Sequence, residues 1–504
     1  SVNETVTYRI VPQLNGCLGD TSNYVVTGIP SAYLSNNPLD TAICSNQLTG
    51  IHLQSNVPGT QFTWYATGSS ILVSGYSNST SPDTLINQTL VNSGFSTETV
   101  TYHITPENSG CPGSNTDFNV IVNPVPKVSL QSIPDSICSA ETTNLQLIGT
   151  VSGTSFSWTA AQGVGNISGF SNGAGSLIAQ QLSNPLLTPG SILYTITPQT
   201  SACIGSDSVV TQWVKPIPAL TNNPLDTTIC DGEFTALSLQ SNVPGTQFTW
   251  TATGSSIQIT GYSNSTSPAT VINQSLVNSG FDTETVTYHI EPENTGCQGS
   301  LSDYAVNVFP VPDVFFLPNG ETLCEGEISN LSLQSHVTGT SFDWTATASS
   351  PNLSGFSDGS GDLIAQTIDN SGKTIEFVTY QVTPAANGCP PGIQMPVVLT
   401  VVPRPVITNT TTGFEQCNNT STSISLESDN PGSTFAWRAF GTSLNVAGYS
   451  NGIGENIIQS LTNSGYTIDT VKYRVAATAN GCPGDSTDLE VTVFPVADIT
   501  FAPN

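Results

Sequence analysis

Eleven cysteines are the residues of this sequence whose type and spacing could do chemistry. They alternate along the chain in two sets, and neighbouring members of each set lie about 93 residues apart. The first set is Cys44, Cys138, Cys230, Cys324 and Cys417, and the second is Cys17, Cys111, Cys203, Cys297, Cys389 and Cys482. One cysteine of each set per unit indicates a disulfide framework, and therefore an oxidising compartment.

The spacing alone leaves the pairing of these cysteines open. Pairs within one unit are 65 to 67 residues apart, and pairs across a join are 27 or 28 apart. We expect pairing within units, because a whole returning strand and a proline linker separate each second-set cysteine from the next unit. Such a loop would stabilise a unit by about 4 kcal/mol. The expected pairs are Cys44–Cys111, Cys138–Cys203, Cys230–Cys297, Cys324–Cys389 and Cys417–Cys482, with the partner of Cys17 preceding Ser1.

Other residue types offer little chemistry. No C-x-x-C spacing accompanies the four histidines, so zinc is not indicated; they are His52, His103, His289 and His336. Asp358 and Asp362 in SDGSGD could hold calcium, but the matching segments read SNGAGS and SNGIGE, so we expect a Gly-rich turn. No nucleophile elbow, zinc-protease motif, phosphate loop or dinucleotide fingerprint is present. We therefore expect no catalytic residues, no bound metal, no cofactor and no enzyme.

The cysteines lie in sequence units that repeat along the chain. SNVPGTQFTW occurs at 55–64 and again at 241–250, and diverged copies lie between and after them. The tryptophan of each copy marks the period: Trp64, Trp158, Trp250, Trp344 and Trp437. The expected domains are 31–126, 127–218, 219–312, 313–405 and 406–497, with the tail of a preceding repeat at 1–30 and the start of another at 498–504. We expect the chain to be a slice of a longer array.

Each unit reads as short β-strands. In TQFTWTAT (246–253) and TVTYHI (285–290), apolar residues alternate with polar ones, which is the pattern of half-buried strands. The sequence therefore predicts an all-β fold, a linear tandem array of immunoglobulin-like β-sandwich domains of about 93 residues each. The recurring aromatic residues alternate with Thr, so we expect them in the cores rather than on a ligand platform. They are the five tryptophans above with Tyr102, Tyr194, Tyr288, Tyr380 and Tyr473.

Composition excludes several partners. The net charge is -28, with 8 Lys+Arg against 36 Asp+Glu. Nucleic acid and anionic lipid surfaces both attract basic proteins, so neither is an expected partner. No run of 18 apolar residues exists, so no direct membrane span is expected. Proline pairs such as Pro124–Pro126 and Pro310–Pro312 should end the last strand of a unit and stiffen a short linker.

The elements of the unit at 219–312 are TICDGE, LSLQS, GTQFTW, GYSN, VTYHIEPENTGCQG and FPVP. This pattern resembles the PKD-like, immunoglobulin-like repeats of giant cell-surface proteins in the Bacteroidetes. It is most similar to the gliding-motility adhesins of flavobacteria, the SprB type. The resemblance implies type IX secretion, partnership with the gliding machinery, and display on the outside of the outer membrane.

The resemblance also implies a function. It would make this chain the repetitive extended stalk or filament of a bacterial adhesin used in surface attachment and gliding motility. Other regions of the full-length protein would bind the surface or polysaccharide substratum. The alternative is a set of spacer domains in a secreted polysaccharide- or protein-degrading enzyme. A eukaryotic receptor with N-glycans at Asn87 and Asn273 fits less well, since the cysteines lie outside the central strands.

A last implication concerns modification. Bacteria of this group O-glycosylate exported proteins at Asp-(Ser/Thr)-apolar sites. The hydroxyl residues in similar contexts here are Thr41, Thr84, Ser136, Ser208, Thr227, Thr470 and Ser486.

Overall fold

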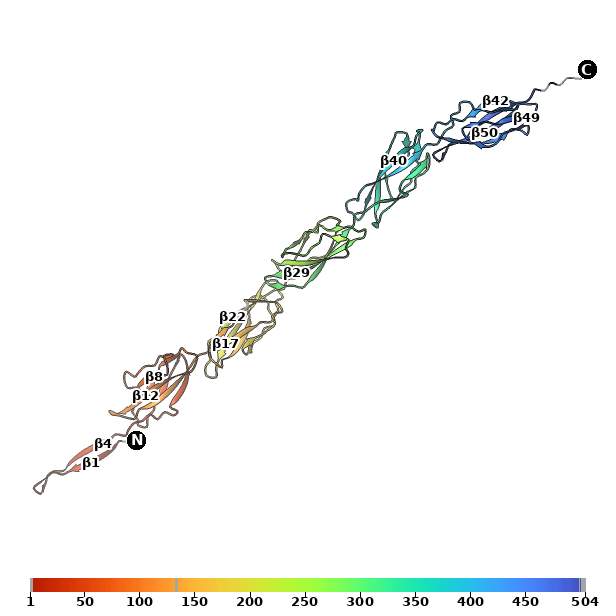
Figure 1. Ribbon diagram of the computed structural model, residues 1–504. Coiled ribbons are helices and arrows are strands. Elements are labelled where there is room, and N and C mark those ends of the chain that lie inside the picture. The colour runs from red at the N-terminus through yellow and green to blue at the C-terminus, as the bar shows by residue number, and fades with distance from the viewer. Residues whose placement is uncertain (1–2, 132–134, 498, 500–504) are drawn as a thin grey trace, which may run out of the picture. The chain divides into compact units, whose positions relative to one another are not determined.

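The computed structural model describes residues 3–131, 135–497 and 499. Every regular element within these residues is a β-strand, and none is an α-helix, as Figure 1 shows. The all-β prediction is confirmed. The predicted start of a further repeat at 498–504 lies outside the described residues except for Ile499.

The second repeat illustrates the architecture of the unit. Its main sheet has the order β16 (Ser136–Cys138), β22 (Ser208–Lys215), β21 (Gly190–Gln199), β18 (Ser155–Gln162) and β19 (Gly173–Ala174). A second sheet of β15 (Val128–Leu130), β17 (Leu145–Gly149) and β20 (Leu177–Ile178) lies in the same repeat. Alternate residues of β18 and β21 are buried, as a sheet with one covered face requires.

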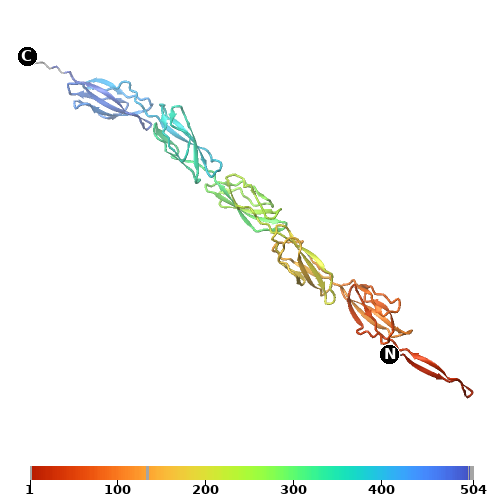
Figure 2. The same cartoon turned by 180° about the vertical axis from the view of Figure 1, so that it is seen from behind.

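The other repeats are built on the same plan, and their main strands can be followed from behind in Figure 2. These strands are β5 (Asp40–Cys44), β8 (Gln61–Gly68), β12 (Glu98–Asn108), β13 (Cys111–Pro112) and β14 (Thr116–Asn123) in repeat 1; β23 (Asp226–Cys230), β25 (Gln247–Gly254), β29 (Glu284–Asn294), β30 (Cys297–Gln298) and β31 (Ser302–Phe309) in repeat 3; β33 (Glu321–Cys324), β35 (Ser341–Ala348), β37 (Gly359–Ser360), β40 (Glu376–Ala385) and β41 (Met395–Val402) in repeat 4; and β42 (Gly413–Cys417), β45 (Thr434–Gly441), β47 (Gly452–Ile453), β50 (Asp469–Ala479), β51 (Cys482–Pro483) and β52 (Thr487–Phe494) in repeat 5.

Shorter strands cover these sheets. They are β6 (Gln47–Leu48), β7 (Ile51–His52), β9 (Val73–Ser74), β10 (Leu85–Ile86) and β11 (Thr89–Asn92) in repeat 1; β24 (Leu237–Ser238), β26 (Ile259–Thr260), β27 (Val271–Ile272) and β28 (Val277–Asn278) in repeat 3; β32 (Phe315–Leu317), β34 (Leu331–Gln334), β36 (Leu353–Ser354), β38 (Leu363–Ile364) and β39 (Asp369–Asn370) in repeat 4; and β43 (Thr420–Ser421), β44 (Ile424–Ser425), β46 (Val446–Ala447), β48 (Asn456–Ile457) and β49 (Ser460–Asn463) in repeat 5. The N-terminal partial copy consists of β1 (Glu4–Ile10), β2 (Gln13–Leu14), β3 (Cys17–Leu18) and β4 (Ser22–Gly28), in which β1 pairs with β4.

Separate hydrophobic cores lie in repeats 1, 2, 4 and 5. The five repeat tyrosines are fully buried, and the five tryptophans are 7–9% exposed. Both sets therefore occupy the core positions that the alternation predicts. Trp213 lies on the outward side of β22 and is 40% exposed. In the partial copy, Tyr8 is exposed, because β1 and β4 have no second layer over them.

A half-buried polar network accompanies each aromatic pair. In repeat 4 the Tyr380 hydroxyl donates to Gln366 Oε1 (2.7 Å), and Gln366 Nε2 donates to the Ser357 carbonyl oxygen (2.9 Å). The indole N–H of Trp344 donates to the same carbonyl oxygen (3.2 Å). The network recurs in the other repeats with Gln88, Gln180, Gln274 and Gln459. Tyrosine and tryptophan can be buried here because their polar atoms find partners.

The first and last strands of each unit pair in parallel. In repeat 1, β5 pairs with β14, and Cys44 lies opposite Asn123 at the end of β14. Cys111 lies in the turn before β14 begins at Thr116. Since β14 has eight residues, about 25 Å of strand separates the two ends. The two cysteines of one repeat therefore lie at opposite ends of its sandwich.

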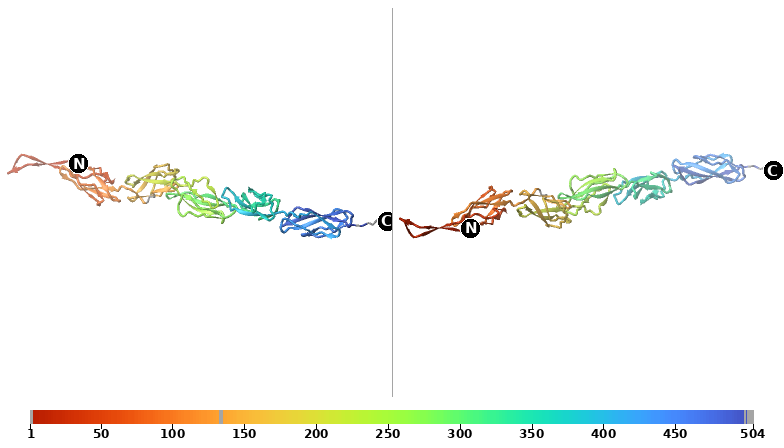
Figure 3. Two further views of the ribbon diagram at one scale, coloured as in Figure 1. Left: turned by 90° about the horizontal axis from the view of Figure 1, so that it is seen from above. Right: turned by 90° about the horizontal axis from the view of Figure 1, so that it is seen from below.

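The proline pairs end the last strands as predicted. β14 ends at Asn123, β22 at Lys215, β31 at Phe309 and β41 at Val402, each directly before a proline. Figure 3 gives two further views of these strands. By compactness the chain divides into two units, one of Ser1–Thr221, Ser241–Gln247 and Glu291–Ser300, and one of the remaining residues.

Candidate functional site: the cysteine junctions

Four disulfides join consecutive repeats rather than closing loops within them. They are Cys44–Cys203, Cys138–Cys297, Cys230–Cys389 and Cys324–Cys482. The Cα atoms of each pair are 5.5–5.8 Å apart. Each bond links the first-set cysteine of one repeat to the second-set cysteine of the next, with a sequence separation of 158 or 159. Each bond lies wholly within one of the two compact units.

The predicted pairing within repeats is therefore wrong. The pairs Cys44–Cys111, Cys138–Cys203, Cys230–Cys297, Cys324–Cys389 and Cys417–Cys482 do not form. The physical reason is the parallel pairing of the first and last strands, which carries the first-set cysteine to the far end of its repeat. The second-set cysteine stays in the turn before the last strand, at the near end. The first-set cysteine at the far end of one repeat therefore bonds the second-set cysteine at the near end of the following repeat.

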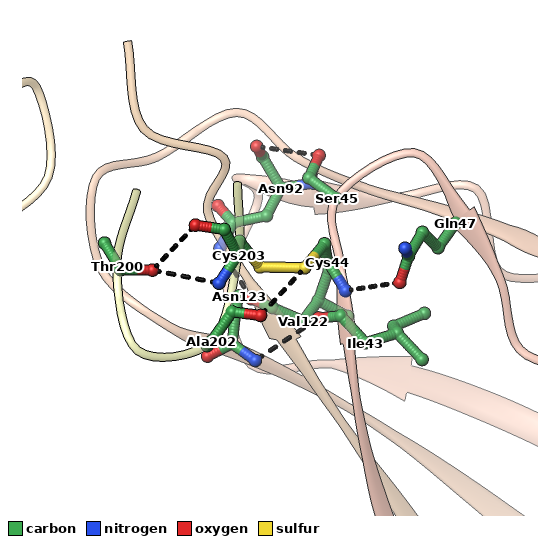
Figure 4. The surroundings of a disulfide bond; sticks show 10 residues. All are labelled: Ile43, Cys44, Ser45, Gln47, Asn92, Val122, Asn123, Thr200, Ala202 and Cys203. Carbon is green, nitrogen blue, oxygen red and sulfur yellow. Dashed lines mark hydrogen bonds between the residues drawn. A yellow bond between two sulfur atoms is a disulfide. The ribbon is translucent and has the colours of Figure 1, made fainter. Parts of the chain in front are cut away.

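Figure 4 shows the first junction in detail. The backbone N–H of Cys44 donates to Gln47 Oε1 (3.0 Å), and the backbone N–H of Cys203 donates to Thr200 Oγ1 (3.0 Å). Asn123, at the end of β14, donates from Nδ2 to the Ile43 carbonyl oxygen (3.3 Å). Cys203 is 2% exposed. Both half-cystines are therefore held by hydrogen bonds from their own repeat.

In the five repeats, a glycine two or three residues after the second-set cysteine has no room for a side chain. A Cβ on Gly205 would lie 2.0 Å from the Pro126 carbonyl oxygen, and one on Gly484 would lie 1.8 Å from the Pro405 carbonyl oxygen. The same clash would occur at Gly113, Gly299 and Gly392. The cysteine turn is therefore packed directly on the linker that enters its own repeat, which fixes the turn at the near end.

Two of the few cations also lie at junctions. Lys215 Nζ donates to the Thr295 carbonyl oxygen (2.8 Å), in the turn before Cys297. Arg404 donates from Nε to the Glu325 carbonyl oxygen (2.9 Å) and from Nη1 to the Pro483 carbonyl oxygen (3.0 Å). Glu325 and Pro483 directly follow the paired cysteines of that junction. The sequence analysis missed both roles, although each cation adjoins a linker proline.

Repeats 3 and 4 also share an aromatic contact. The ring centroid of His336 lies 4.6 Å from that of Phe281 and 4.8 Å from that of Phe315. His336 Nδ1 lies 2.6 Å from Asp313 Oδ2. Burial pushes the pKa of the Asp313 carboxyl upward, but hydrogen bonds from His336 and Ser335 outweigh it and hold that pKa below its ordinary value.

Three cysteines have no disulfide partner, and all three are exposed: Cys17, Cys111 and Cys417. The prediction that Cys111 and Cys417 are disulfide-bonded within this chain is therefore not met. Cys417 ends β42, as Cys44 ends β5, and Cys111 occupies the turn position of Cys203. Cys111 and Cys417 thus occupy positions that form disulfides elsewhere in the chain.

The histidines and acidic residues singled out from the sequence are structural. His103 and His289 lie on the outward face, half-buried, with Nδ1 2.6 Å from Asp117 and Asp303. Asp358 Oδ1 accepts the Ala346 N–H (2.8 Å), the role that Asn264 and Asn451 have in their repeats. The part of the chain that the structure describes contains no group of three His, Cys, Asp or Glu residues that could hold a metal ion.

The residues in the proposed glycosylation contexts are accessible to different degrees. Thr84 and Ser486 are exposed, and Thr41, Ser136, Ser208, Thr227 and Thr470 are half-buried. Glycan occupancy stays a prediction. Within residues 3–131, 135–497 and 499, no helix is long and apolar enough to cross a bilayer.

Comparison with known proteins gives a family for the repeats. A PKD-like domain matches residues 41–126, 135–218, 227–312, 321–405 and 415–497. No curated protein matches. The boundaries between repeats stay a prediction.

Solved structures of low similarity also match. The extracellular domain of protocadherin gamma-B4 aligns at 10% identity and a TM-score of 0.26, covering 98% of this chain and 89% of that one. Immunoglobulin domains 1–5 of Sidekick-1 align at 10% identity and a TM-score of 0.25, covering 92% and 99%. The titin I-band fragment I67–I69 aligns at 11% identity and a TM-score of 0.31, covering 55% and 98%. With five matches that span most of its length, this chain belongs to the PKD-like domain family.

Proposed function

We propose that these five PKD-like repeats form a tension-bearing stalk of an extracellular adhesin. The observation that carries the proposal is the order of the disulfides along the chain. The intervals 44–203, 138–297, 230–389 and 324–482 overlap, so every peptide bond between Cys44 and Cys482 is spanned by at least one bridge. Force can therefore pass along the chain without running through the full backbone.

The bridges make two interleaved covalent paths. One path runs across Cys44–Cys203, along the chain to Cys230, and across to Cys389. The other runs across Cys138–Cys297, along the chain to Cys324, and across to Cys482. Each path alternates one disulfide with a join of 27 residues. The chain segments Cys138–Cys203 and Cys324–Cys389 connect the two paths, and the fully extended chain runs through one of them.

The route of the chain through a repeat supports the same function. The entering linker contacts the glycine after the cysteine turn, and the last strand leads away from that turn to the opposite end. A chain that enters a repeat at one end and leaves at the other adds length with each repeat. Near-identical units of this kind give a stalk its reach additively.

The finer assignment rests on the sequence resemblance. It places the stalk on the outside of a bacterial outer membrane, after type IX secretion, in an adhesin for surface attachment and gliding motility. Disulfide bonds favour an extracellular place, since they persist in oxidising compartments. The net charge of -28 favours repulsion between neighbouring stalks. No observation specifically favours the alternative, a spacer in a secreted enzyme.

Single-molecule stretching of the whole chain from its two ends tests the proposal. When oxidised, the chain can lengthen only to the limit of its shortest covalent route. One such route follows Ser1–Cys44, crosses to Cys203, returns along the chain to Cys138, crosses to Cys297, continues to Cys324, crosses to Cys482 and ends at Asn504. It contains roughly 157 residues, or about 530 Å at about 3.4 Å per residue. After reduction all 504 residues can extend, to roughly 1,700 Å.

Variants make the test specific. Removing the Cys230–Cys389 bridge alone should leave the limit unchanged, because this shortest route uses only the other three bridges. Removing the Cys230–Cys389 and Cys324–Cys482 bridges together should raise the limit to roughly 315 residues, about 1,070 Å. Equal extension of the oxidised and reduced chains would contradict the proposal.

A further inference from the structure

The outward face of the main sheet in repeat 5 differs from that of the other repeats. Three of the eight Lys+Arg residues of the chain lie on it: Arg438 on β45, and Lys472 and Arg474 on β50. The register places Arg438 directly opposite Arg474. The residues at this position in repeats 1, 2 and 4 are the pairs Tyr65–His103, Thr159–Thr195 and Thr345–Gln381.

Carboxylates neutralise two of these three cations. Arg474 binds Asp488 with two hydrogen bonds of 2.8 and 3.0 Å, and Lys472 lies 3.1 Å from Glu490 and 3.5 Å from Asp488. Arg438 is exposed, and among the described residues it makes no ion pair. Its guanidinium is therefore available to an anion from solution.

A hollow of about 640 Å³, wide open to solvent, lies beside Arg438. Its floor is Ala436 opposite Ala476, and its wall is Ile453, which is paired with Ala436 and 83% exposed. Larger or polar pairs stand at the place of the two alanines in repeats 1, 2 and 4: Thr63–Thr105, Ser157–Thr197 and Asp343–Thr383. Among these four repeats, repeat 5 has the smallest pair of side chains at this place.

The hollow combines three kinds of contact. Arg438 and Arg474 bring guanidinium groups to the lining, Ala436, Ala476 and Ile453 bring aliphatic groups, and Ser486 brings a hydroxyl. A guanidinium binds a carboxylate in a planar, bidentate manner. The apolar surface and the serine hydroxyl together suit a sugar ring, which has C–H faces and hydroxyl groups. We propose that this hollow binds a carboxylated sugar, a uronate unit of an acidic polysaccharide.

Charge and strand geometry favour this occupant over a protein segment. The chain as a whole is acidic and repels anions, so attraction for a carboxylate is confined to the place where Arg438 is unpaired. An extended peptide would need a sheet edge to pair with, but the edge strand beside the hollow, β47, has two residues. The proposal does not depend on the stalk function, since it concerns one repeat.

Titration of the whole oxidised chain with trigalacturonate, followed by NMR or calorimetry, tests the site. Arg438→Ala should weaken binding at least tenfold, and Arg438→Lys should weaken it less. Ala476→Leu, which fills the hollow and keeps every charge, should also weaken it. The control variant Lys373→Ala removes an exposed cation of repeat 4 and should bind as the parent chain does.

The ligand side of the test uses matched probes. The methyl ester of trigalacturonate keeps the rings and hydroxyls but lacks the charge, and it should bind at least tenfold more weakly. Two results would overturn the proposal: equal binding of acid and ester, or unchanged binding by both Arg438→Ala and Ala476→Leu. Binding of a polyglutamate peptide as tight as that of trigalacturonate would also overturn it, in favour of a protein partner.

Discussion

At the residue scale, each repeat contains an aromatic pair whose polar atoms are linked through one glutamine and one serine carbonyl oxygen. The pair of tryptophan and tyrosine is visible in the sequence, because the two types recur with alternation in every unit. The glutamine and serine that connect the two aromatic residues cannot be recognised in the sequence, since Gln and Ser are common in the loops of this chain. Only the fold brings Gln366 within hydrogen-bonding distance of the Tyr380 hydroxyl.

Removing one hydroxyl tests this network. Tyr380→Phe leaves Gln366 Oε1 with the Ser357 N–H as its remaining donor, so repeat 4 should lose about 1 kcal/mol. Hydrogen exchange of the β40 amides measures this loss. Tyr466→Phe is the control, since Tyr466 is 89% exposed, and it should change nothing. An equal effect of both substitutions would show that the network has no role in stability.

The buried phenols also predict how stability depends on pH. Burial raises the pKa of Tyr194 to about 12, and it raises the pKa of Tyr102, Tyr288, Tyr380 and Tyr473 as well. A pKa raised in the folded state means that stability is complete below the unfolded value of about 10 and is lost as the pH rises above it. Phenolate absorbance should show the exposed tyrosines ionising first and these five only on unfolding. Ionisation of all 14 tyrosines together near pH 10, with the fold intact, would contradict this.

The decisive feature at the element scale is the parallel pairing of the first and last strands. The strands themselves could be predicted, because alternation marks β25 and β29 closely. The pairing could not, since alternation shows which face of a strand is buried and not which strand lies beside it. The cysteine spacing therefore favours the short separations of 65–67 and 27–28 residues, whereas the observed separation of 158 or 159 follows only from the pairing of the strands.

A glycine substitution tests how the cysteine turn is positioned. Gly484→Ala would push a Cβ to 1.8 Å from the Pro405 carbonyl oxygen, so the turn that carries Cys482 must move. We expect repeat 5 to lose about 1–3 kcal/mol and the Cys324–Cys482 bond to form incompletely. Alkylation of free thiols under non-reducing conditions measures this. Gly413→Ala in the same repeat meets nothing within 4 Å and should leave the thiol count unchanged. Full bridge formation in Gly484→Ala would contradict the account.

The whole molecule is a chain of separately cored repeats whose sulfur bridges connect neighbours. The sequence indicates the cores correctly. The prediction of one disulfide within each repeat is wrong, because the disulfides link consecutive repeats. Because the bridges overlap, the covalent structure is redundant from Cys44 to Cys482. This redundancy keeps the two parts of the chain joined after a single cut by a protease.

Cleavage at one engineered site tests the redundancy. A protease site placed at Ile257, which is 92% exposed, lies inside both the Cys138–Cys297 and Cys230–Cys389 intervals. After cleavage the protein should run as one species on a non-reducing gel and as two after reduction. Two fragments without reduction would mean that these bridges are absent.

Disulfide mapping by mass spectrometry of the oxidised chain is the most direct test of the central claim, that bridges link neighbouring repeats. Acid digestion without reduction should yield peptides that join Cys138 to Cys297 and Cys230 to Cys389. Peptides that join Cys138 to Cys203 and Cys230 to Cys297 would show bridges within repeats and contradict the account.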